Sequence, residues 1–492
     1  MKTSERTLYL SAGLMVLLLS GCMVGPKYKT PPAPAAPKFK ELPAEAYKEG
    51  NGWKVAEPND ALIRGKWWEI YGDPELNALE EQVGISNQNV LAAEARYRQA
   101  QDAIRAARSS LFPTVGSSPA VTNSQSSGTL YTGNQLTSLV QRRTVFNLPL
   151  SFSYEADVWG RIRRTITQNV ANAQASAADL ENAKLSYQAA VAGNYFALRG
   201  LDTAEELYQR TVKLYEEYLQ LTRDRQEAGI ASESDVAQAE TQLLSTRAQL
   251  VDIGVARAQY EHAIAVLVGK APAEIALRKL GLPAKLPDVP VEVPSKLLER
   301  RPDIALAERQ MAAANESIGI AKAAFYPSLG LSANGGFQTA HFTDWFTWPS
   351  KFWSIGPSAA QTLFDAGRRR AVVAQSEHVF DETVANYRQT VLTGFQQVED
   401  NLAALRILSE EAGIQQQAVE AALRALDVVT AQYKAGTTDF LQVIISQSAA
   451  FSAQQGAVSI STRRMAASVS LVQALGGGWD VSQLPSSASL RK

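Results

Sequence analysis

Apolar residues in one long segment recur alternately three and four residues apart. Between Gly160 and about Thr222 there is no proline, glycine is scarce and alanine is abundant. The positions that follow this spacing are Tyr187, Val191, Asn194, Leu198, Leu201, Glu205, Tyr208, Val212, Tyr215 and Leu219. A repeat of 3.5 residues is the one that winds helices into a left-handed coiled coil. The segment is therefore predicted to form a single helix of roughly 90 Å, at 1.5 Å per residue.

The same spacing returns later in the chain and in the segments that follow two glycines. An equivalent track begins at Val398 and ends at Leu426. Beyond Gly229 and Gly436 the spacing resumes near Val236 and Val443. Each long helix is thus predicted to turn back on itself as an antiparallel hairpin. The two turns fall at 223–229 and 432–436, far from the predicted strands.

Four other segments alternate apolar with small or polar residues, which is the period of a β-strand. They are predicted at about 113–123, 143–157, 327–338 and 351–364. Segments of about ten residues with this alternation are typical of transmembrane barrel strands, and nearby aromatic residues fit an interfacial girdle. Those aromatic residues are Trp345, Phe346, Trp348, Phe352 and Trp353. An ordinary sandwich sheet is the alternative, and Pro149 fits neither well because it has no N–H to donate.

The two halves of the chain repeat each other. Gly160-Arg161 matches Gly367-Arg368, Ala228-Gly229 matches Ala435-Gly436, and Val268-Gly269 matches Leu475-Gly476, all at an offset of 207. Upstream, Phe112-Pro113 matches Tyr326-Pro327 at an offset of 214. The change of seven residues falls in a predicted loop between strands, as a structural duplication requires.

The strand count then constrains the assembly. Two strands per repeat give four per chain, which cannot close a barrel, and an open edge in lipid leaves backbone groups unpaired. If these strands span a membrane, the chain must oligomerise, and three copies supply 12 strands, within the range known for such barrels. A monomeric porin is excluded.

Composition excludes several other functions. With 48 Lys+Arg and 49 Asp+Glu there is no charge excess to attract nucleic acid. The single cysteine rules out internal disulfides, and His262, His341 and His378 are far apart in sequence. No phosphate-binding loop, metal cluster or catalytic triad is present in the sequence. We expect a protein that is not an enzyme and needs no cofactor.

The N-terminus has the features of an export signal. Lys2 and Arg6 precede a short apolar run from Leu8 to Leu19, too short for a comfortable membrane span. The run ends in Leu19-Ser20-Gly21-Cys22, which resembles the lipobox of bacterial lipoproteins and implies lipidation of Cys22. In that family, Met23 rather than aspartate after the cysteine implies delivery to the outer membrane. The prolines that follow predict an extended tether.

These observations give a predicted domain layout. It comprises a signal peptide (1–21), a lipidated Pro-rich tether (22–60), repeat 1 (61–269), a linker (270–300), repeat 2 (301–478) and a C-terminal tail (479–492).

Three ordered motifs on this duplicated chain resemble the TolC-like outer membrane factors, specifically the lipoprotein (NodT-type) branch of tripartite RND efflux systems. They begin at Gly65, Leu298 and Ala474, and read GKWWEIYGDPEL, LERRPDI and ALGGGW. The resemblance covers essentially the whole mature chain. It implies an α+β membrane protein whose duplicated helix–strand–strand–helical hairpin units assemble as a homotrimer, with a 12-stranded outer-membrane β-barrel and a periplasmic α-helical coiled-coil barrel.

The same resemblance implies the function and the partners. The protein would be the exit duct of an efflux pump, anchored in outer-membrane lipid and extending into the periplasm. It would passively conduct small toxic compounds received from an inner-membrane RND pump through a periplasmic adaptor. No nucleic acid is expected as a partner.

The candidate site residues lie at the hairpin tips. Arg225, Gly229, Lys434 and Gly436 are candidates for adaptor docking, although the glycines could serve only as helix caps. Leu441 and Ile445 match positions that constrict the pore in related lipoproteins. Relatives often place an aspartate where this chain has Ile445, so a hydrophobic constriction is predicted. The alternative is that both residues belong to the coiled-coil core.

Two other functions remain open from sequence. One is a duct for secreted proteins, since the tunnel does not itself select its cargo. The other is a structural coiled-coil envelope lipoprotein, which would not need apolar strand residues such as Phe146, Leu148, Leu150 and Phe152.

Overall fold

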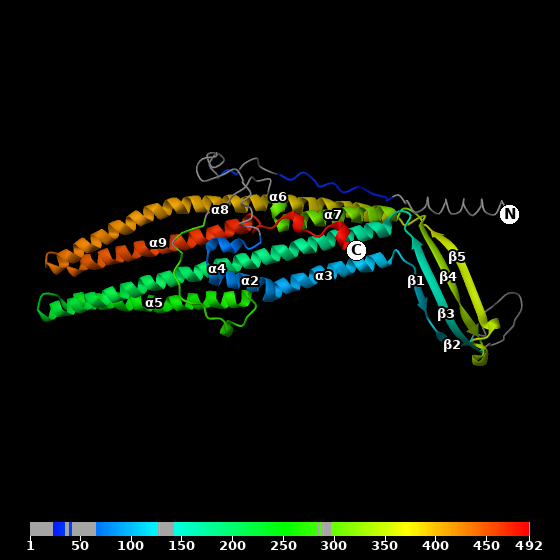
Figure 1. Ribbon diagram of the computed structural model, residues 1–492, viewed down its shortest axis with the longest axis horizontal. Coiled ribbons are helices and arrows are strands. Elements are labelled where there is room, and N and C mark those ends of the chain that lie inside the picture. The colour runs from blue at the N-terminus through cyan, green and yellow to red at the C-terminus, as the bar shows by residue number, and fades with distance from the viewer. Residues whose placement is uncertain are drawn as a thin grey trace.

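The computed structural model describes residues 23–34, 39–41, 65–125, 127, 142–283, 285–287, 289 and 297–491. These residues form a long helical body, and a five-stranded sheet leaves one end of it at a steep angle (Figure 1). The predicted signal peptide, Cys22 and most of the predicted tether lie outside the described residues.

The three main helices of each repeat match those of the other in length and order. Repeat 1 contains α3 (Gln88–Ser109), β1 (Thr114–Ser117), β2 (Ala120–Gln125), β3 (Arg142–Ala156), α4 (Arg161–Glu227) and α5 (Glu233–Leu267). Repeat 2 contains α7 (Pro302–Ala323), β4 (Ser328–Thr339), β5 (Lys351–Ala360), α8 (Arg368–Lys434) and α9 (Phe440–Ala474). α4 and α8 both have 67 residues, α5 and α9 both have 35, and α3 and α7 both have 22. The bounds of these helices therefore repeat at the offsets of 214 and 207 seen in the sequence.

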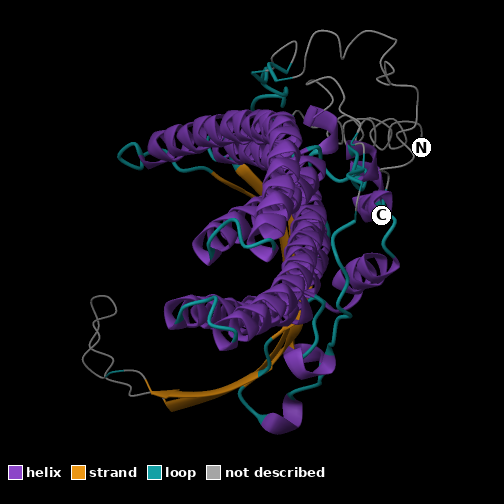
Figure 2. Cartoon of the chain, turned by 90° about the vertical axis from the view of Figure 1, so that its left-hand side faces the viewer, coloured by secondary structure: helices purple, strands orange, loops and turns teal. Residues whose placement is uncertain are grey.

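The helices form a curved wall one layer thick. In the half that carries the tips, α5 packs on α4, α4 on α9, and α9 on α8. In the half next to the sheet, α3 packs on α4, α4 on α7, and α7 on α8. Viewed from the tips, the wall is an arc with one concave face (Figure 2). One edge of the arc is therefore α5 and α3, and the other edge is α8.

The strands continue this curvature in one antiparallel sheet. β3 pairs with β1 and β2 on one side and with β4 on the other, and β5 completes the sheet beyond β4. The register aligns Phe152 with Ala333 and Ala333 with Ile355, so apolar residues share one face. Several large members of this face are exposed: Val115, Val121, Leu150, Leu331, Trp353 and Ile355. Ser151, Asn334 and Ser354 lie on the opposite, polar face.

The first predicted strand is interrupted. The sequence predicts one strand over about 113–123, whereas β1 and β2 are separated by Ser118 and Pro119. The break lies beside Pro149 in the middle of β3, since Ser117 pairs with Leu150 and Ala120 pairs with Asn147. Pro149, which has no N–H to donate, therefore lies where the ladder to β1 and β2 is interrupted, and its carbonyl accepts a hydrogen bond from the Ser117 hydroxyl at 2.7 Å.

The region between β4 and β5 also differs from the prediction. β5 ends at Ala360 rather than at 364, and Leu363 and Phe364 are exposed beyond it. Two short 3-10 helices, η6 (Phe342–Asp344) and η7 (Trp348–Ser350), lie in this region, and η7 contains Trp348 of the predicted aromatic cluster. Trp345 and Phe346 stack with ring centroids 5.3 Å apart.

The body is thickest at its middle, where short elements cover the long helices. η3 (Trp67–Tyr71) and α2 (Pro74–Ser86) pack on α4, and Trp67 and Trp68 of the first family-like motif are buried. The remaining short helices are η4 (Pro272–Glu274), α6 (Leu297–Arg300), η8 (Val481–Gln483) and α10 (Ser487–Leu490). Asp202 accepts hydrogen bonds from Arg257 at 2.7 Å and from the N–H of Leu280 at 3.1 Å, which fixes the described part of the inter-repeat linker on α4 and α5.

The described part of the predicted tether has no regular secondary structure, but it is packed against the body. Residues 23–34, called here the strap, begin where Val24 N–H donates to Trp159 O at 3.2 Å. Farther along, the Tyr28 hydroxyl donates to Glu308 of α7 at 2.6 Å. Burial and the adjoining Glu308 carboxylate raise the pKa of Tyr28, so this hydroxyl keeps its proton. The strap is thus extended as expected, yet it is held by specific contacts.

No helix in the described part of the chain is both long and apolar enough to cross a bilayer.

Candidate functional site at the hairpin tips

The α4–α5 turn closes by glycine capping. Gly229 has φ of 74°, a left-handed conformation that residues with a side chain rarely adopt. Its N–H donates to Gln226 O, and Ile230 N–H donates to Arg225 O, so the last carbonyls of α4 are satisfied. Ser232 then begins α5 through a reciprocal capping box with Asp235. The turn is therefore capped both at the end of α4 and at the start of α5.

The α8–α9 turn repeats this design at the other tip. Gly436 has φ of 76°, and Thr437 N–H donates to Gln432 O. The Asp439 side chain accepts a hydrogen bond from Gln442 N–H and begins α9. Gly229 and Gly436 are therefore helix caps. Both are also exposed, as is Lys434 at the end of α8.

Arg225 connects the two tips. Its guanidinium lies over the ring of Tyr433, 4.5 Å from the centroid, and Nη1 donates to Tyr433 O at 2.7 Å. Tyr433 in turn packs on Phe440, with ring centroids 5.5 Å apart. Arg225 is thus engaged within the chain and holds the α4–α5 tip against the α8–α9 tip.

An apolar cluster lies directly beneath this contact. Tyr215, Tyr218, Leu219, Leu243, Tyr433, Phe440 and Val443 are buried there together. Burial raises the pKa of Tyr215, so its hydroxyl stays neutral and accepts a hydrogen bond from Gln242 at 3.2 Å. The tips are therefore anchored on a shared core drawn from all four hairpin helices. Sequence reasoning missed Tyr433 and Phe440, although each lies within four residues of Gly436.

Leu441 and Ile445 lie outside that core. Leu441 is 49% exposed and Ile445 is 52% exposed, whereas Phe440 and Val443 on the same helix are 3% and 0% exposed. Neither residue belongs to the coiled-coil core of this chain. Two apolar side chains one helical turn apart are thus left on a surface of α9.

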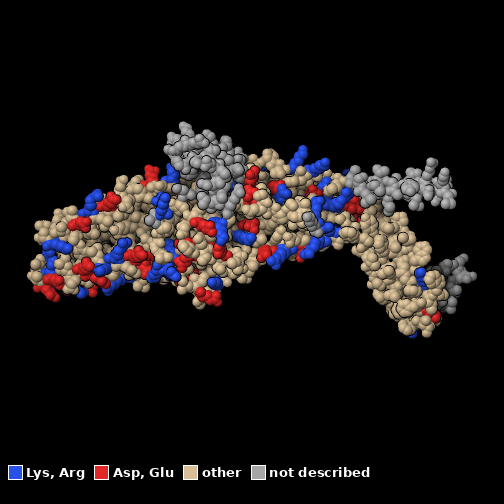
Figure 3. Space-filling model, in the orientation of Figure 1, with Lys and Arg blue, Asp and Glu red and all other residues tan. Residues whose placement is uncertain are grey.

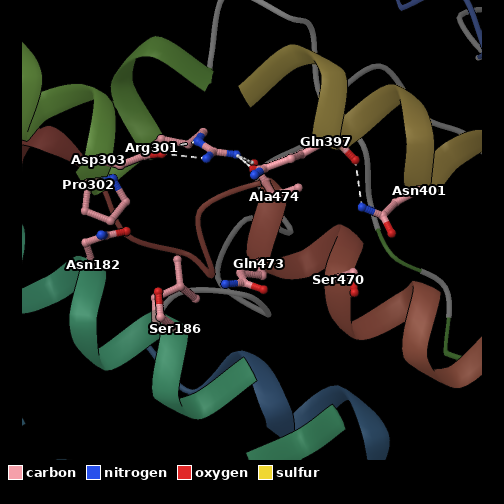
Figure 4. A pocket seen from close by; sticks show the side chains of 11 residues that line it. Asn182, Ser186, Arg301, Pro302, Asp303, Gln397, Asn401, Ser470, Gln473 and Ala474 are labelled. Carbon is pink, nitrogen blue, oxygen red and sulfur yellow. Dashed lines mark hydrogen bonds and ion pairs between the residues drawn. The ribbon is translucent and has the colours of Figure 1, made fainter. Parts of the chain in front are cut away.

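A second feature is a cavity of about 450 Å³ at the middle of the body, between α4, α7, α8 and α9 (Figure 4). Arg301 points along its rim and donates to Gln397 Oε1 and Ala474 O, each at 2.9 Å, and to Asp303. These contacts join the start of repeat 2 to α8 and to the end of α9. Arg301 and Asp303 of the Arg-Arg-Pro-Asp motif therefore have a structural role.

Within the described residues, no group of three or more His, Cys, Asp or Glu side chains is placed to hold a metal ion.

Comparisons with known proteins identify the family. The model of the outer membrane efflux protein family matches residues 80–270 and 293–477, one segment in each repeat. The toluene efflux pump outer membrane protein TtgC of Pseudomonas putida is 31% identical over 96% of this chain and 95% of its own length. The pyoverdine export outer membrane protein OpmQ of Pseudomonas aeruginosa is 32% identical over 86% of this chain and 90% of its own.

A solved structure agrees with this relationship. The MtrE outer membrane channel of Neisseria gonorrhoeae, in its open state, superposes with a TM-score of 0.79 at 26% identity. The match covers 94% of this chain and 99% of that one. Its fold is the one described above, and the predicted location in the outer membrane and role in efflux are both confirmed by these relatives. The chain therefore belongs to the outer membrane efflux protein family and is an exit duct of an efflux pump.

Proposed function

We propose that three copies of the chain close into a continuous tube that conducts small toxic compounds passively from the periplasmic side to the exterior. The observation that carries this proposal is that both open edges of the curved wall bear unpaired apolar residues. On α5 these are Leu244, Val251 and Val255, which are 53%, 77% and 58% exposed. On α8 they are Ile407, Ile414 and Val428, which are 52%, 64% and 57% exposed.

The spacing of these residues matches a coiled coil. Leu244 and Val251 are seven residues apart, as are Ile407 and Ile414, and Val428 is two further heptads along. α5 and α8 are opposite edges of one chain, so they cannot pair with each other within it. Rotation about an axis on the concave side brings α8 of one copy against α5 of the next, and such head-to-tail contacts close into a ring.

The sheet supports the same arrangement. Its edges are β1 with β2 on one side and β5 on the other, and unpaired edges in lipid would be strongly unfavourable. Counting the interrupted β1–β2 pair as one strand, three copies give the 12 strands of a barrel. The apolar sheet face would contact lipid, and the polar face would line the lumen. Figure 3 shows that the sheet carries few charged side chains on the visible face, unlike the helical body.

We further propose that residues 1–21 direct export and that Cys22 is lipidated, with 22–60 as the tether. The strap supports this placement. Met23 lies against Gly160 at the start of α4, next to the base of the sheet. A lipid on the preceding residue would therefore enter the membrane where the strands do.

The partners follow from the tips. A periplasmic adaptor is proposed to bind there, with Arg225, Gly229, Lys434 and Gly436 in or near the contact, and to connect the duct to an inner-membrane RND pump. Because Arg225 is occupied by Tyr433, Lys434 is the cation more available to a partner. The named cargoes of two relatives, toluene and pyoverdine, indicate small molecules rather than proteins.

Leu441 and Ile445 are proposed to narrow the tube at its periplasmic end. Three copies would place six apolar side chains around the axis, a ring that resists wetting and ion passage. Replacing Ile445 by aspartate would add three carboxylates to this ring. We expect Ile445→Asp channels in planar bilayers to show higher conductance and stronger cation preference than wild type.

The matched control is Leu280→Asp, at an apolar residue of the linker that is 48% exposed. It should leave both quantities unchanged. If Ile445→Asp channels behave as wild type in conductance and ion selectivity, Ile445 does not face the pore.

A further inference from the structure

Arginines gather at the end of the helical body from which the sheet leaves. α3 and α7 end there, and α4 and α8 begin there, so their terminal turns lie at one level along the molecule (Figure 1). Figure 3 shows blue side chains crowded at this end, directly beside the nearly uncharged sheet.

Most basic residues at this level have a carboxylate partner. Arg105 pairs with Asp102, Arg161 with Glu155, Arg163 with Asp157, Lys322 with Glu377, and Arg369 with Asp365. Four arginines do not pair with a carboxylate among the described residues: Arg108, Arg368, Arg370 and Arg491. We call these four the basic collar. It adds four uncompensated positive charges per chain, although the whole chain has a net charge of −1.

Internal stability does not explain the basic collar. Arg108 donates to the backbone carbonyl of Arg491, and Arg491 donates to the Thr167 hydroxyl at 3.0 Å, so among the described residues both cations have neutral acceptors. Arg368 and Arg370 are exposed in the first turn of α8, where the helix dipole disfavours positive charge. Arginines without a carboxylate partner, two of them at a helix N-terminus, are unfavourable in isolation. They are expected where a bound ligand supplies the compensating negative charge.

The surroundings indicate what that ligand is. Exposed apolar side chains lie between the basic collar and the strands: Phe112, Tyr326, Leu363 and Phe364 are 65%, 43%, 90% and 86% exposed. Beyond them begins the apolar sheet face. The sequence of surfaces from body to sheet is therefore cationic, aromatic and then aliphatic, which is complementary to the phosphate, interface and acyl region of one phospholipid leaflet.

We propose that the basic collar binds the headgroups of anionic phospholipids in the periplasmic leaflet of the outer membrane. This inference rests on the proposed barrel, because it needs the sheet to be in the bilayer. Bound lipid would fix the depth of the barrel and the angle of the helical body to the membrane.

The test uses the full-length trimer, delipidated in detergent and titrated with phosphatidylglycerol or phosphatidylcholine while bound lipids are counted by native mass spectrometry. Wild type is expected to prefer phosphatidylglycerol. A cation near an anionic surface contributes about fivefold to binding, so Arg108→Gln/Arg491→Gln should weaken phosphatidylglycerol binding by about tenfold or more. Phosphatidylcholine binding should not change.

Arg368→Gln/Arg370→Gln is an independent variant, because these two side chains make no hydrogen bond to the described residues. It should lower the preference for phosphatidylglycerol in the same way. Arg108→Lys/Arg491→Lys should retain it. The matched control is Arg210→Gln/Arg424→Gln, which removes two exposed arginines from the tip half of α4 and α8.

Equal binding of phosphatidylglycerol by wild type and both collar variants would overturn the proposal. So would a parallel loss of phosphatidylglycerol and phosphatidylcholine binding in the collar variants. Failure of the proposed function would give a different result from failure of lipid binding. The wild-type protein would then neither form trimers nor conduct ions in planar bilayers.

Discussion

At the scale of single residues, Glu80 is an ionisable side chain buried beside apolar ones. It lies on the buried side of α2 with Leu76 and Val83, and it is 0% exposed. Burial raises the pKa of Glu80 well above its usual value, so the carboxyl keeps its proton to a higher pH in the folded protein than in the unfolded chain. Because this pKa is raised on folding, the carboxyl favours the folded state at low pH and opposes it as pH rises.

We therefore expect Glu80→Gln to stabilise the protein at pH 8 and to have little effect at pH 4. Wild type loses up to about 1.4 kcal/mol per pH unit between the unfolded and folded pKa values, and the variant does not. Thermal denaturation of the detergent-solubilised protein across this range measures the difference. Glu81→Gln, at an exposed neighbour, is the control. Parallel pH profiles for Glu80→Gln and wild type would contradict the prediction.

Residues also show where sequence reasoning reaches its limit. The capping roles of Gly229 and Gly436 follow from local turn chemistry and are predictable. The contact between Arg225 and Tyr433 joins residues 208 apart, and no local pattern specifies it. Pro149 is an anomaly in sequence, and only the register shows that it lies beside a break between β1 and β2.

At the scale of elements, the long helices were the easiest part to predict. A heptad pattern over many turns predicts a long coiled-coil helix, and in this duplicated chain the pattern occurs in both repeats. The first strand was harder, because alternation over 113–123 conceals the interruption at Ser118 and Pro119. Pro119 was the available signal, since a proline cannot donate to a ladder. The contacts of the strap depend on Tyr28 and Glu308, which lie 280 residues apart.

The exposed stripe of α8 gives the element-scale prediction. Ile414→Asp should destabilise the trimer, because each interface loses a buried side chain worth about 1.5–3 kcal/mol and gains a charge in its place. Mass photometry after dilution should show monomers at concentrations where wild type is trimeric. Val481→Asp, at an exposed apolar residue of the C-terminal tail, is the control and should remain trimeric. An unchanged trimer population for Ile414→Asp would place the interface elsewhere.

At the scale of the whole molecule, the proposed lipid on Cys22 would be a second attachment rather than the only one. The proposed barrel alone holds the protein in the membrane, and the strap is bound to α7 independently of the cysteine. We expect Cys22→Ser, exported behind a different signal peptide, to yield membrane-inserted trimers with measurable efflux. Fractionation and a toxicity assay in a duct-deficient strain test this. Recovery of the protein only as soluble monomers would contradict the barrel.

The equal lengths of α4 and α8, and of α5 and α9, have one more consequence. At 67 residues each, the two longest helices reach about 100 Å, and both hairpins end level with each other. Six tips in a trimer would then form a flat rim. An insertion in one repeat alone would lengthen only three of the six tips. The rim would then be uneven, and the three shorter tips would not reach a partner that the longer ones contact. The distance that the duct spans in the periplasm is therefore determined by both repeats of the chain, and it can change only when both repeats change length together.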